Sequence, residues 1–551
     1  MLIAPLLLGA LAGAIQDVDG PTPELQPEQL EAAARVAGLE FSEQELKLML
    51  ADVRGRLAAY EALRERDQPN GWLPAVSFSA LLPGIAPKLH AFPGEGPVSP
   101  LEVQRPESEE ELCLLSIPEL GVLLRNGELN CVELTEIYLD RLERLDEVLH
   151  CVISYTRERA LAQAAERDAE LARGVDRGPL HGIPWGAKDL LAVAGTRTTW
   201  GAAPFREQVL DETATVVERL DKAGAVLIAK LSLGALAMGD VWFDGRTRNP
   251  WNTSQGSSGS SAGPASAVVA GGVGFAIGSE TLGSIVSPSV RCGVSSLRPT
   301  FGRVPRTGAM TLSWTMDKLG PMCRNASGAG LVLRAIAGPD GQDPTALDQP
   351  LPDCSGLVLE GLRCGVPAGL AREGALGSVL EQLQAMGVEL VEVSLPDYPV
   401  GAMLITLSAE AATAFDELTR SGQDDQLTRQ MRGAWPNTFR AARLIPAVEY
   451  LRAQRLRSQL CKEMTLVLGS VDFLVHSPFG AGLLSMTNLT GQPTFVAPVF
   501  TSESGSPDAI CFTGRLFDDA FILALVQRWQ EAAGHPLRHP RPLAEAGGEG
   551  R

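Results

Sequence analysis

Residues 249–308 read NPWNTSQGSSGSSAGPASAVVAGGVGFAIGSETLGSIVSPSVRCGVSSLRPTFGRVPRTG, and this stretch decides the fold. Glycine and serine dominate it, yet two apolar segments interrupt them, at 265–270 and 273–277. A flexible linker would lack such segments. The stretch is therefore predicted to be folded, with its backbone N–H groups and hydroxyls held at defined positions.

Two common glycine-rich motifs fail on this stretch. A dinucleotide-binding loop needs a third glycine after Gly272 and Gly274, but Ile277 stands in its place. A nucleophile elbow, G-x-S-x-G, matches residues 259–263 with Ser261 as the nucleophile. An elbow must follow an apolar strand, whereas the preceding segment RNPWNTSQ is polar and broken by a proline. Both interpretations are rejected.

A serine nucleophile here needs a base other than histidine, because none of the six histidines lies between His181 and His476. A lysine can serve if burial lowers its pKa from ~10.4 towards neutrality. Lys188 lies in the apolar run LHGIPWGAKDLL, where an unpaired ammonium group would be costly. The alternative is an ordinary lysine that pairs with a carboxylate at a strand end.

Three motifs in order carry a family resemblance: GIPWGAKD at 182–189, SGSS at 258–261 and GSETLGS at 278–284. The chain resembles the amidase signature family, which keeps this separation between its bridging and nucleophilic serines. The resemblance covers residues 111 to 541. It implies an α/β fold with a large mixed central β-sheet covered by helices on both faces. The alternation of apolar strand-like runs with helical periodicity independently favours an α/β architecture.

The resemblance also implies an activity, the hydrolysis of carboxylic amides through an acyl-enzyme, with no cofactor and no metal. Lys188 would be the base, Ser260 the bridging serine on a cis peptide bond, and Ser284 the nucleophile. The remaining predicted site residues are an oxyanion hole of backbone N–H groups and two supporting side chains: Thr281, Leu282 and Gly283 for the hole, and Ser261 and Glu280 in support.

Five positions depart from the family pattern. Ala262 and Pro264 stand where the family has a glycine and a serine, and three more departures surround Ser284. Leu282 stands where the family has glycine, Glu280 where it has aspartate, and Val286 where it has arginine. If position 282 takes a positive φ, leucine would be strained there. Without the arginine, Glu280 loses the buried partner that the family pattern provides.

The sequence predicts that the chain is divided into four segments. Residues 1–15 are apolar, too short to span a bilayer, and end in small residues, which is typical of a signal peptide. A helical appendage and Pro-rich connector follow at 16–110, with one helix expected over 29–66, then the amidase domain at 111–541 and a disordered tail at 542–551. The protein would be exported, periplasmic or extracellular, if the leader is cleaved and cytoplasmic otherwise.

The net charge of −19 argues against nucleic acid as a partner. The nine cysteines form no Cys-x-x-Cys pair, so free and mostly buried thiols are expected. We expect a small-molecule amide substrate, no stable membrane span, and a monomer or homodimer.

Two other functions stay open on the sequence. One is a non-catalytic or weakly active amidase-like binding protein. The other is the glutaminase subunit of a tRNA-dependent amidotransferase, against which the leader and appendage argue, because that complex works in the cytosol.

Overall fold

A computed structural model describes residues 25–65, 68–84, 86–94, 101–500, 507–534 and 539–540. Within these ranges no helix has the length and hydrophobicity needed to cross a membrane. The predicted signal peptide at 1–15 and the predicted tail at 542–551 lie outside the described residues, and both stay predictions.

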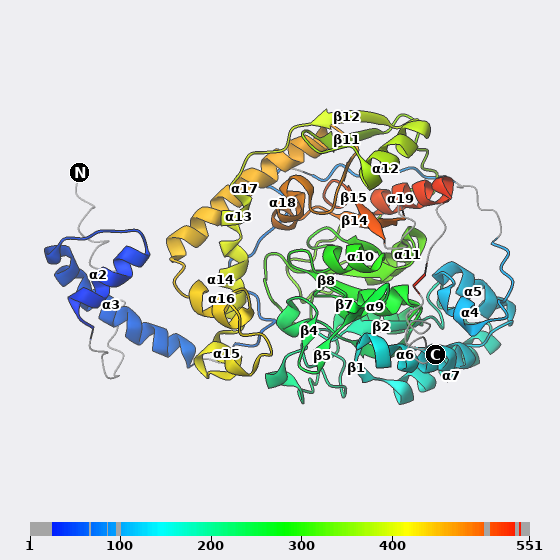
Figure 1. Ribbon diagram of the computed structural model, residues 1–551, viewed down its shortest axis with the longest axis horizontal. Coiled ribbons are helices and arrows are strands. Elements are labelled where there is room, and N and C mark those ends of the chain that lie inside the picture. The colour runs from blue at the N-terminus through cyan, green and yellow to red at the C-terminus, as the bar shows by residue number, and fades with distance from the viewer. Residues whose placement is uncertain are drawn as a thin grey trace.

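Within the described residues, eleven strands form one mixed sheet in the order β1-β3-β2-β8-β10-β9-β14-β15-β13-β11-β12 (Figure 1). The strands are β1 (Val152–Tyr155), β2 (Pro184–Lys188), β3 (Val226–Leu231), β8 (Phe275–Glu280), β9 (Ser295–Arg298), β10 (Lys318–Cys323), β11 (Arg363–Pro367), β12 (Glu389–Val393), β13 (Phe473–His476), β14 (Thr494–Val499) and β15 (Asp508–Thr513). Two further two-stranded sheets are formed by β4 (Val241–Trp242) with β5 (Gly245–Arg246) and by β6 (Arg248–Asn249) with β7 (Asn252–Gly256).

Strand β2 lies between β3 and β8 and runs parallel to both. Every residue of the three strands is buried, which explains why their sequences are mostly continuous apolar runs rather than alternating ones. The strands predicted near 226–229 and 471–475 are present as β3 and β13. The parallel trio brings the carboxyl ends of β2 and β8 to the same edge of the sheet.

Helices flank the sheet, as the α/β interpretation predicts (Figure 1). They are α4 (Glu109–Leu114), α5 (Ile117–Asn126), α6 (Cys131–Leu149), α7 (Arg157–Ala172), α8 (Thr215–Lys222), α9 (Ala262–Val269), α10 (Val286–Cys292), α11 (Ala326–Ile336), α12 (Gly374–Ala385), α13 (Val400–Met403), α14 (Ile405–Ala414), α15 (Asp416–Arg420), α16 (Trp435–Ala442), α17 (Ala447–Gly469), α18 (Leu483–Thr490) and α19 (Asp519–Ala533). Helix α9 packs against β2, β3 and β8, so the glycine- and serine-rich stretch builds the centre of the molecule. All nine cysteines are buried and unpaired, as expected.

The N-terminal appendage differs from its prediction. One helix was expected over 29–66, but two form, α2 (Pro27–Val36) and α3 (Glu43–Arg64). Gly38 takes a φ of +71° after α2, a left-handed conformation that ends a helix, and Ser42 then caps α3 through its side chain. The two helices stand off one end of the molecule (Figure 1).

The segment at 68–94 contains neither helix nor strand in its described residues, as a Pro-rich connector should. It nevertheless packs on the body of the protein. The His90 ring stacks on Phe521 with centroids 4.0 Å apart and lies 2.5 Å from the Asp518 carboxylate. The connector therefore packs against the surface of the folded domain.

Candidate active site

Lys188 is the last residue of β2 and is fully buried. Because β2 and β8 are parallel, with Ala187 opposite Ile277, their carboxyl ends lie side by side. Ser279, near the end of β8, therefore lies next to Lys188. The lysine Nζ is 2.8 Å from the Ser279 hydroxyl.

Ser260 and Ser261 reach the same amine from the start of α9. The Gly259–Ser260 peptide bond is cis, as the family resemblance implies. A Cβ at position 259 would lie 1.9 Å from the carbonyl oxygen of Gly239, so only glycine fits there. Lys188 Nζ is 2.8 Å from Ser260 Oγ and 3.0 Å from Ser261 Oγ.

The hydrogen bonds of Ser261 exclude its hydroxyl as a proton donor to Lys188. The Ser261 hydroxyl donates to the Ser279 carbonyl at 3.1 Å and accepts from the Ser279 N–H at 3.2 Å. A hydroxyl has one proton, so Ser261 can only accept from the lysine. Within the described part of the chain, the Ser260 hydroxyl has no partner besides Lys188. Ser260 is therefore free to donate to an uncharged amine.

Burial lowers the pKa of Lys188 well below its ordinary value, and the carboxylates of Asp317 and Glu280 only partly oppose this effect. The hydrogen-bond partners of Lys188 are serine hydroxyls and one carbonyl, and no described carboxylate forms an ion pair with it. Lys230, on the neighbouring strand, does form such a pair with Asp189 at 2.7 Å. The alternative of a carboxylate-paired lysine thus describes Lys230 and not Lys188.

Ser284 lies in the loop that joins β8 to α10 and is 8% exposed. The Ser261 N–H donates to the Ser284 carbonyl at 3.0 Å, which ties the two serine segments together. No direct hydrogen bond joins the hydroxyls of Ser260 and Ser284 among the described contacts. Catalytic hydrogen bonds are often long without substrate and shorten when it binds.

The predicted oxyanion loop, 281–284, avoids the strain that Leu282 could have caused. Gly283 is the residue with a positive φ, +85°, whereas Leu282 has a negative one. The Thr281 hydroxyl donates to Asp317 at 2.5 Å, which anchors the start of the loop. Leucine in place of glycine therefore carries no backbone penalty here.

Glu280 keeps a buried cationic partner despite Val286. Its carboxylate accepts from the N–H groups of Ile285 and Val286, at 2.8 and 2.9 Å, and from the Asn488 amide at 2.7 Å. Arg298 lies 3.0 Å away, and both side chains are fully buried. The expectation that Val286 leaves Glu280 without a buried partner is wrong, because Arg298 on β9 pairs with it.

We expect Arg298→Met to destabilise the protein by about 3–5 kcal/mol, because it leaves the Glu280 carboxylate buried without its cation. Arg452→Met removes an exposed ion pair with Glu449 and should change stability by less than about 0.5 kcal/mol. Urea unfolding of both variants measures the difference. Equal midpoints would contradict this description of the pair.

Sequence reasoning missed two residues of this site, Ser279 and Asp317. Ser279 lies inside the 278–284 motif, and its place near the end of a buried strand beside Lys188 could have indicated it. Asp317 comes from a separate segment, and no local pattern joins it to Thr281. Burial raises the pKa of Asp317, and the Thr281 hydroxyl, Arg306 and the Ser313 and Leu312 N–H groups oppose that rise.

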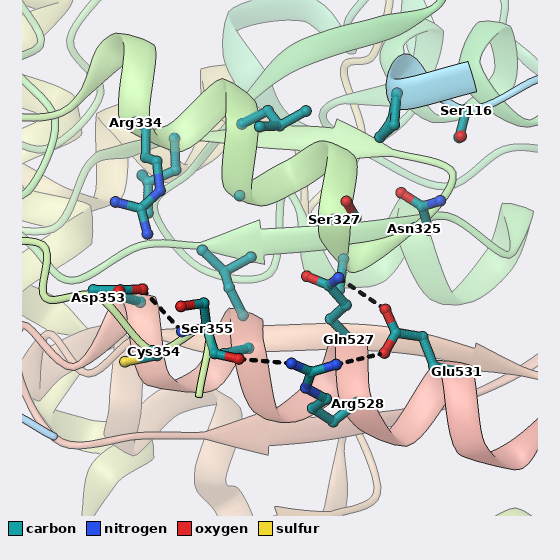
Figure 2. A pocket seen from close by; sticks show the side chains of 18 of the residues that line it. Ser116, Asn325, Ser327, Arg334, Asp353, Cys354, Ser355, Gln527, Arg528 and Glu531 are labelled. Carbon is teal, nitrogen blue, oxygen red and sulfur yellow. Dashed lines mark hydrogen bonds and ion pairs between the residues drawn. The ribbon is translucent and has the colours of Figure 1, made fainter. Parts of the chain in front are cut away.

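A cavity of about 670 Å³ lies elsewhere, between α5, α11 and α19 (Figure 2). Figure 2 shows polar side chains around it, among them Asn325, Arg334, Asp353, Arg528 and Glu531. None of the predicted site residues lines this cavity. A much smaller cavity, of about 10 Å³, is lined by Ser279, Thr281 and Asp317 among others, and not by Lys188, Ser260 or Ser284.

Comparisons with known proteins identify the family of this chain. The family model named Amidase matches residues 133–481. A glutamyl-tRNA(Gln) amidotransferase subunit of Methylococcus capsulatus is 32% identical over 483 residues, which cover 78% of this chain and 99% of the relative. The same subunit of Chloroflexus aggregans is 34% identical over 485 residues, with the same coverage.

Solved structures give the same fold. The peptide amidase of Stenotrophomonas maltophilia matches with a TM-score of 0.69 and 28% identity, covering 77% of this chain and 98% of its own. A chain of a vestigial protein complex, solved in connection with the evolutionary origins of an s-triazine catabolic enzyme, matches with a TM-score of 0.70 and 27% identity, covering 76% of this chain and 99% of its own. This chain therefore belongs to the amidase family, and its lysine and serine motifs resemble the signature of that family.

Proposed function

We propose that the chain hydrolyses a carboxylic amide through an acyl-enzyme on Ser284, with Ser260 as the bridging serine and Lys188 as the base. One observation carries the proposal: a fully buried lysine whose contacts are serine hydroxyls and a carbonyl rather than a carboxylate. Burial lowers the pKa of such an amine, and in its uncharged form it can take a proton.

In the acylation step, Lys188 accepts the proton of Ser260 while Ser260 accepts the proton of Ser284. The Ser284 oxygen attacks the amide carbonyl carbon, and the carbonyl π electrons move onto oxygen. When the C–N bond breaks, the proton passes back through Ser260 to the departing nitrogen. Water then repeats the sequence on the ester, which releases the acid and restores Ser284.

The negative oxygen of the tetrahedral intermediate would be held by the backbone N–H groups of Thr281, Leu282 and Gly283. Support for this assignment comes from the anchors of the loop. Asp317 fixes Thr281, and Glu280 binds the two N–H groups that follow Ser284. Donors that are fixed before the reaction need no reorganisation as charge develops.

The comparisons favour a second, more specific function, the glutaminase subunit of a tRNA-dependent amidotransferase, over a free-standing amidase. The glutamyl-tRNA(Gln) amidotransferase relatives are 31–34% identical, and the match spans nearly their whole length. This ranking reverses the one that the leader and appendage suggested. In this function the substrate is the side-chain amide of glutamine and the protein works with partner subunits. In the first function it works alone on another amide.

Ammonia release from a panel of amides distinguishes these functions. The glutaminase function predicts that kcat/KM is highest for glutamine, whereas a free amidase should prefer a peptide amide or an apolar amide. Asparagine, one methylene shorter than glutamine, serves as the matched control substrate. Absence of turnover on every amide, with the fold intact, would leave the non-catalytic alternative.

We expect kcat/KM to fall as pH decreases, because only uncharged Lys188 can accept a proton. Burial lowers the pKa of Lys188 well below its ordinary value, so the uncharged amine persists to lower pH than in an exposed lysine, and the base is lost once further acidification protonates it. The apparent pKa belongs to the coupled Lys188–Ser260 unit. A pH–rate profile measures it, and a flat profile between about pH 5 and 9 would count against the lysine as base.

A further inference from the structure

The connector at 68–94 precedes the region that the family model matches, which begins at residue 133. It nonetheless contacts a largely buried loop of the amidase body, residues 309–317. Thr311 and Leu312 of this loop line the small cavity beside Ser279 and Thr281. The connector can therefore influence the site without touching a reacting atom.

Asn70 makes the first of two connections. Its side chain accepts from the Thr311 N–H at 2.6 Å and donates to the Thr311 carbonyl at 3.0 Å. It also donates to the carbonyl of Ala414, at the end of α14, at 3.3 Å. Its own carbonyl accepts from the Trp314 indole at 3.3 Å. One side-chain amide thus satisfies both backbone groups of a cavity-lining residue.

Phe78 makes the second connection through a buried arginine. The Arg457 guanidinium lies 3.5 Å from the centre of the Phe78 ring, and it donates to the hydroxyl and the carbonyl of Thr315, each at 2.8 Å. Phe78 also meets Phe301 edge to face, with centroids 5.3 Å apart. The ring therefore covers the arginine that holds the far end of the loop.

Asp317 connects the loop to the predicted oxyanion hole through hydrogen bonds. The N–H groups of Leu312 and Ser313 donate to one oxygen of Asp317, at 2.8 and 2.9 Å. The other oxygen accepts from the Thr281 hydroxyl. A chain of direct contacts thus runs from Asn70, through the loop backbone, to the residue that begins the oxyanion loop.

The body of the protein also holds the loop without the connector. Glu410 on α14 accepts from the Ser313 hydroxyl at 2.6 Å and from the Thr315 N–H at 3.1 Å. Loss of Asn70 should therefore loosen one wall of the cavity rather than unfold the loop.

We propose that Asn70 and Phe78 are positioning residues of the active site: they fix the cavity-lining loop 309–317 from the N-terminal connector and so set how tightly the amide substrate is held. This inference rests on the proposed function. On this proposal the connector contributes to the site, although it lies N-terminal to the residues that the family model matches.

The test compares four full-length proteins: wild type, Asn70→Ala, Asn70→Asp and Trp72→Ala. Trp72 is the matched control, because it is two residues away and 76% exposed. We expect Asn70→Ala to raise KM about 10-fold with kcat within about 3-fold, since it weakens substrate positioning but leaves the proton relay untouched. Asn70→Asp keeps the acceptor for the Thr311 N–H and loses the donor, so its KM should be intermediate.

Hydrogen exchange gives a second readout that does not depend on turnover. The amides of Thr311, Leu312 and Ser313 should exchange faster in Asn70→Ala than in wild type or Trp72→Ala, while the strands of the sheet keep their protection. Phe78→Leu should have the same effect on Thr315.

The outcomes separate the two proposals. If wild type is active and Asn70→Ala matches Trp72→Ala in both KM and exchange, the positioning role is refuted while the proposed function stands. Faster exchange with unchanged KM would also refute it, because the contacts would then stabilise the surface alone. If wild type neither turns over amides nor reacts with a fluorophosphonate, the proposed function fails, and the positioning role of Asn70 fails with it.

Discussion

Ser284→Ala should abolish amide hydrolysis, lowering kcat by about 10⁴-fold or more, because no other group can form the acyl-enzyme. Ser284 lies at the right place for this role: 8% exposed, in the loop between β8 and α10, with its carbonyl tied to the backbone of Ser261. The substitution removes one hydroxyl that makes no hydrogen bond among the described residues. The melting temperature should therefore stay close to that of wild type.

Ser287→Ala is the matched control, because Ser287 follows three residues later, at the start of α10, and has no assigned role. Steady-state kinetics on the best amide substrate, with circular dichroism to check the fold, provides the measurement. Turnover near the wild-type rate in Ser284→Ala would show that the nucleophile lies elsewhere. Loss of turnover in Ser287→Ala as well would point to general damage of the loop.

Lys188→Met should lower kcat/KM by about 10²–10⁴-fold, the usual contribution of a general base. Methionine has nearly the volume of lysine but accepts no proton. The substitution also removes a buried amine whose pKa is lowered by the cost of burying its charge, while Ser260 and Ser279 lose a hydrogen-bond partner. These two effects on stability oppose each other, so the loss of activity should exceed any loss of stability.

The pH profile of Lys188→Met distinguishes a base from a structural lysine. Without the lysine, the residual rate should rise with hydroxide concentration and lose the acid limb assigned to the Lys188–Ser260 unit. A variant that keeps the wild-type pH dependence, even at a lower rate, would contradict the role of Lys188 as base.

The sequence indicated the parts of the site that are local in the chain. The motifs at 182–189, 258–261 and 278–284 each lie at the end of a strand or the start of a helix, so their positions follow from the local sequence. The structure brings Lys188 and Ser260 within hydrogen-bonding distance. Strands β3 and β13 were predictable for a similar reason, since buried strands are short apolar runs bounded by turn residues.

The sequence could not indicate the contacts made between distant segments. Arg298 is the buried cationic partner of Glu280, and it reaches Glu280 from β9, a contact that exists only in the folded sheet. Asp317 and Asn70 likewise act across long separations in the chain. The prediction of a single helix over 29–66 was wrong because the helical periodicity of the sequence continues across Gly38. In the structure Gly38 has a left-handed conformation, and it lies between two separate helices.

Peptide mapping of a fluorophosphonate adduct tests the central claim most directly. The native protein is treated with the reagent, digested, and analysed by mass spectrometry. The account predicts one adduct, on Ser284, that is lost in Ser284→Ala and greatly slowed in Lys188→Met. An adduct on Ser261, the serine of the rejected elbow motif, or no adduct on a folded protein, would contradict it.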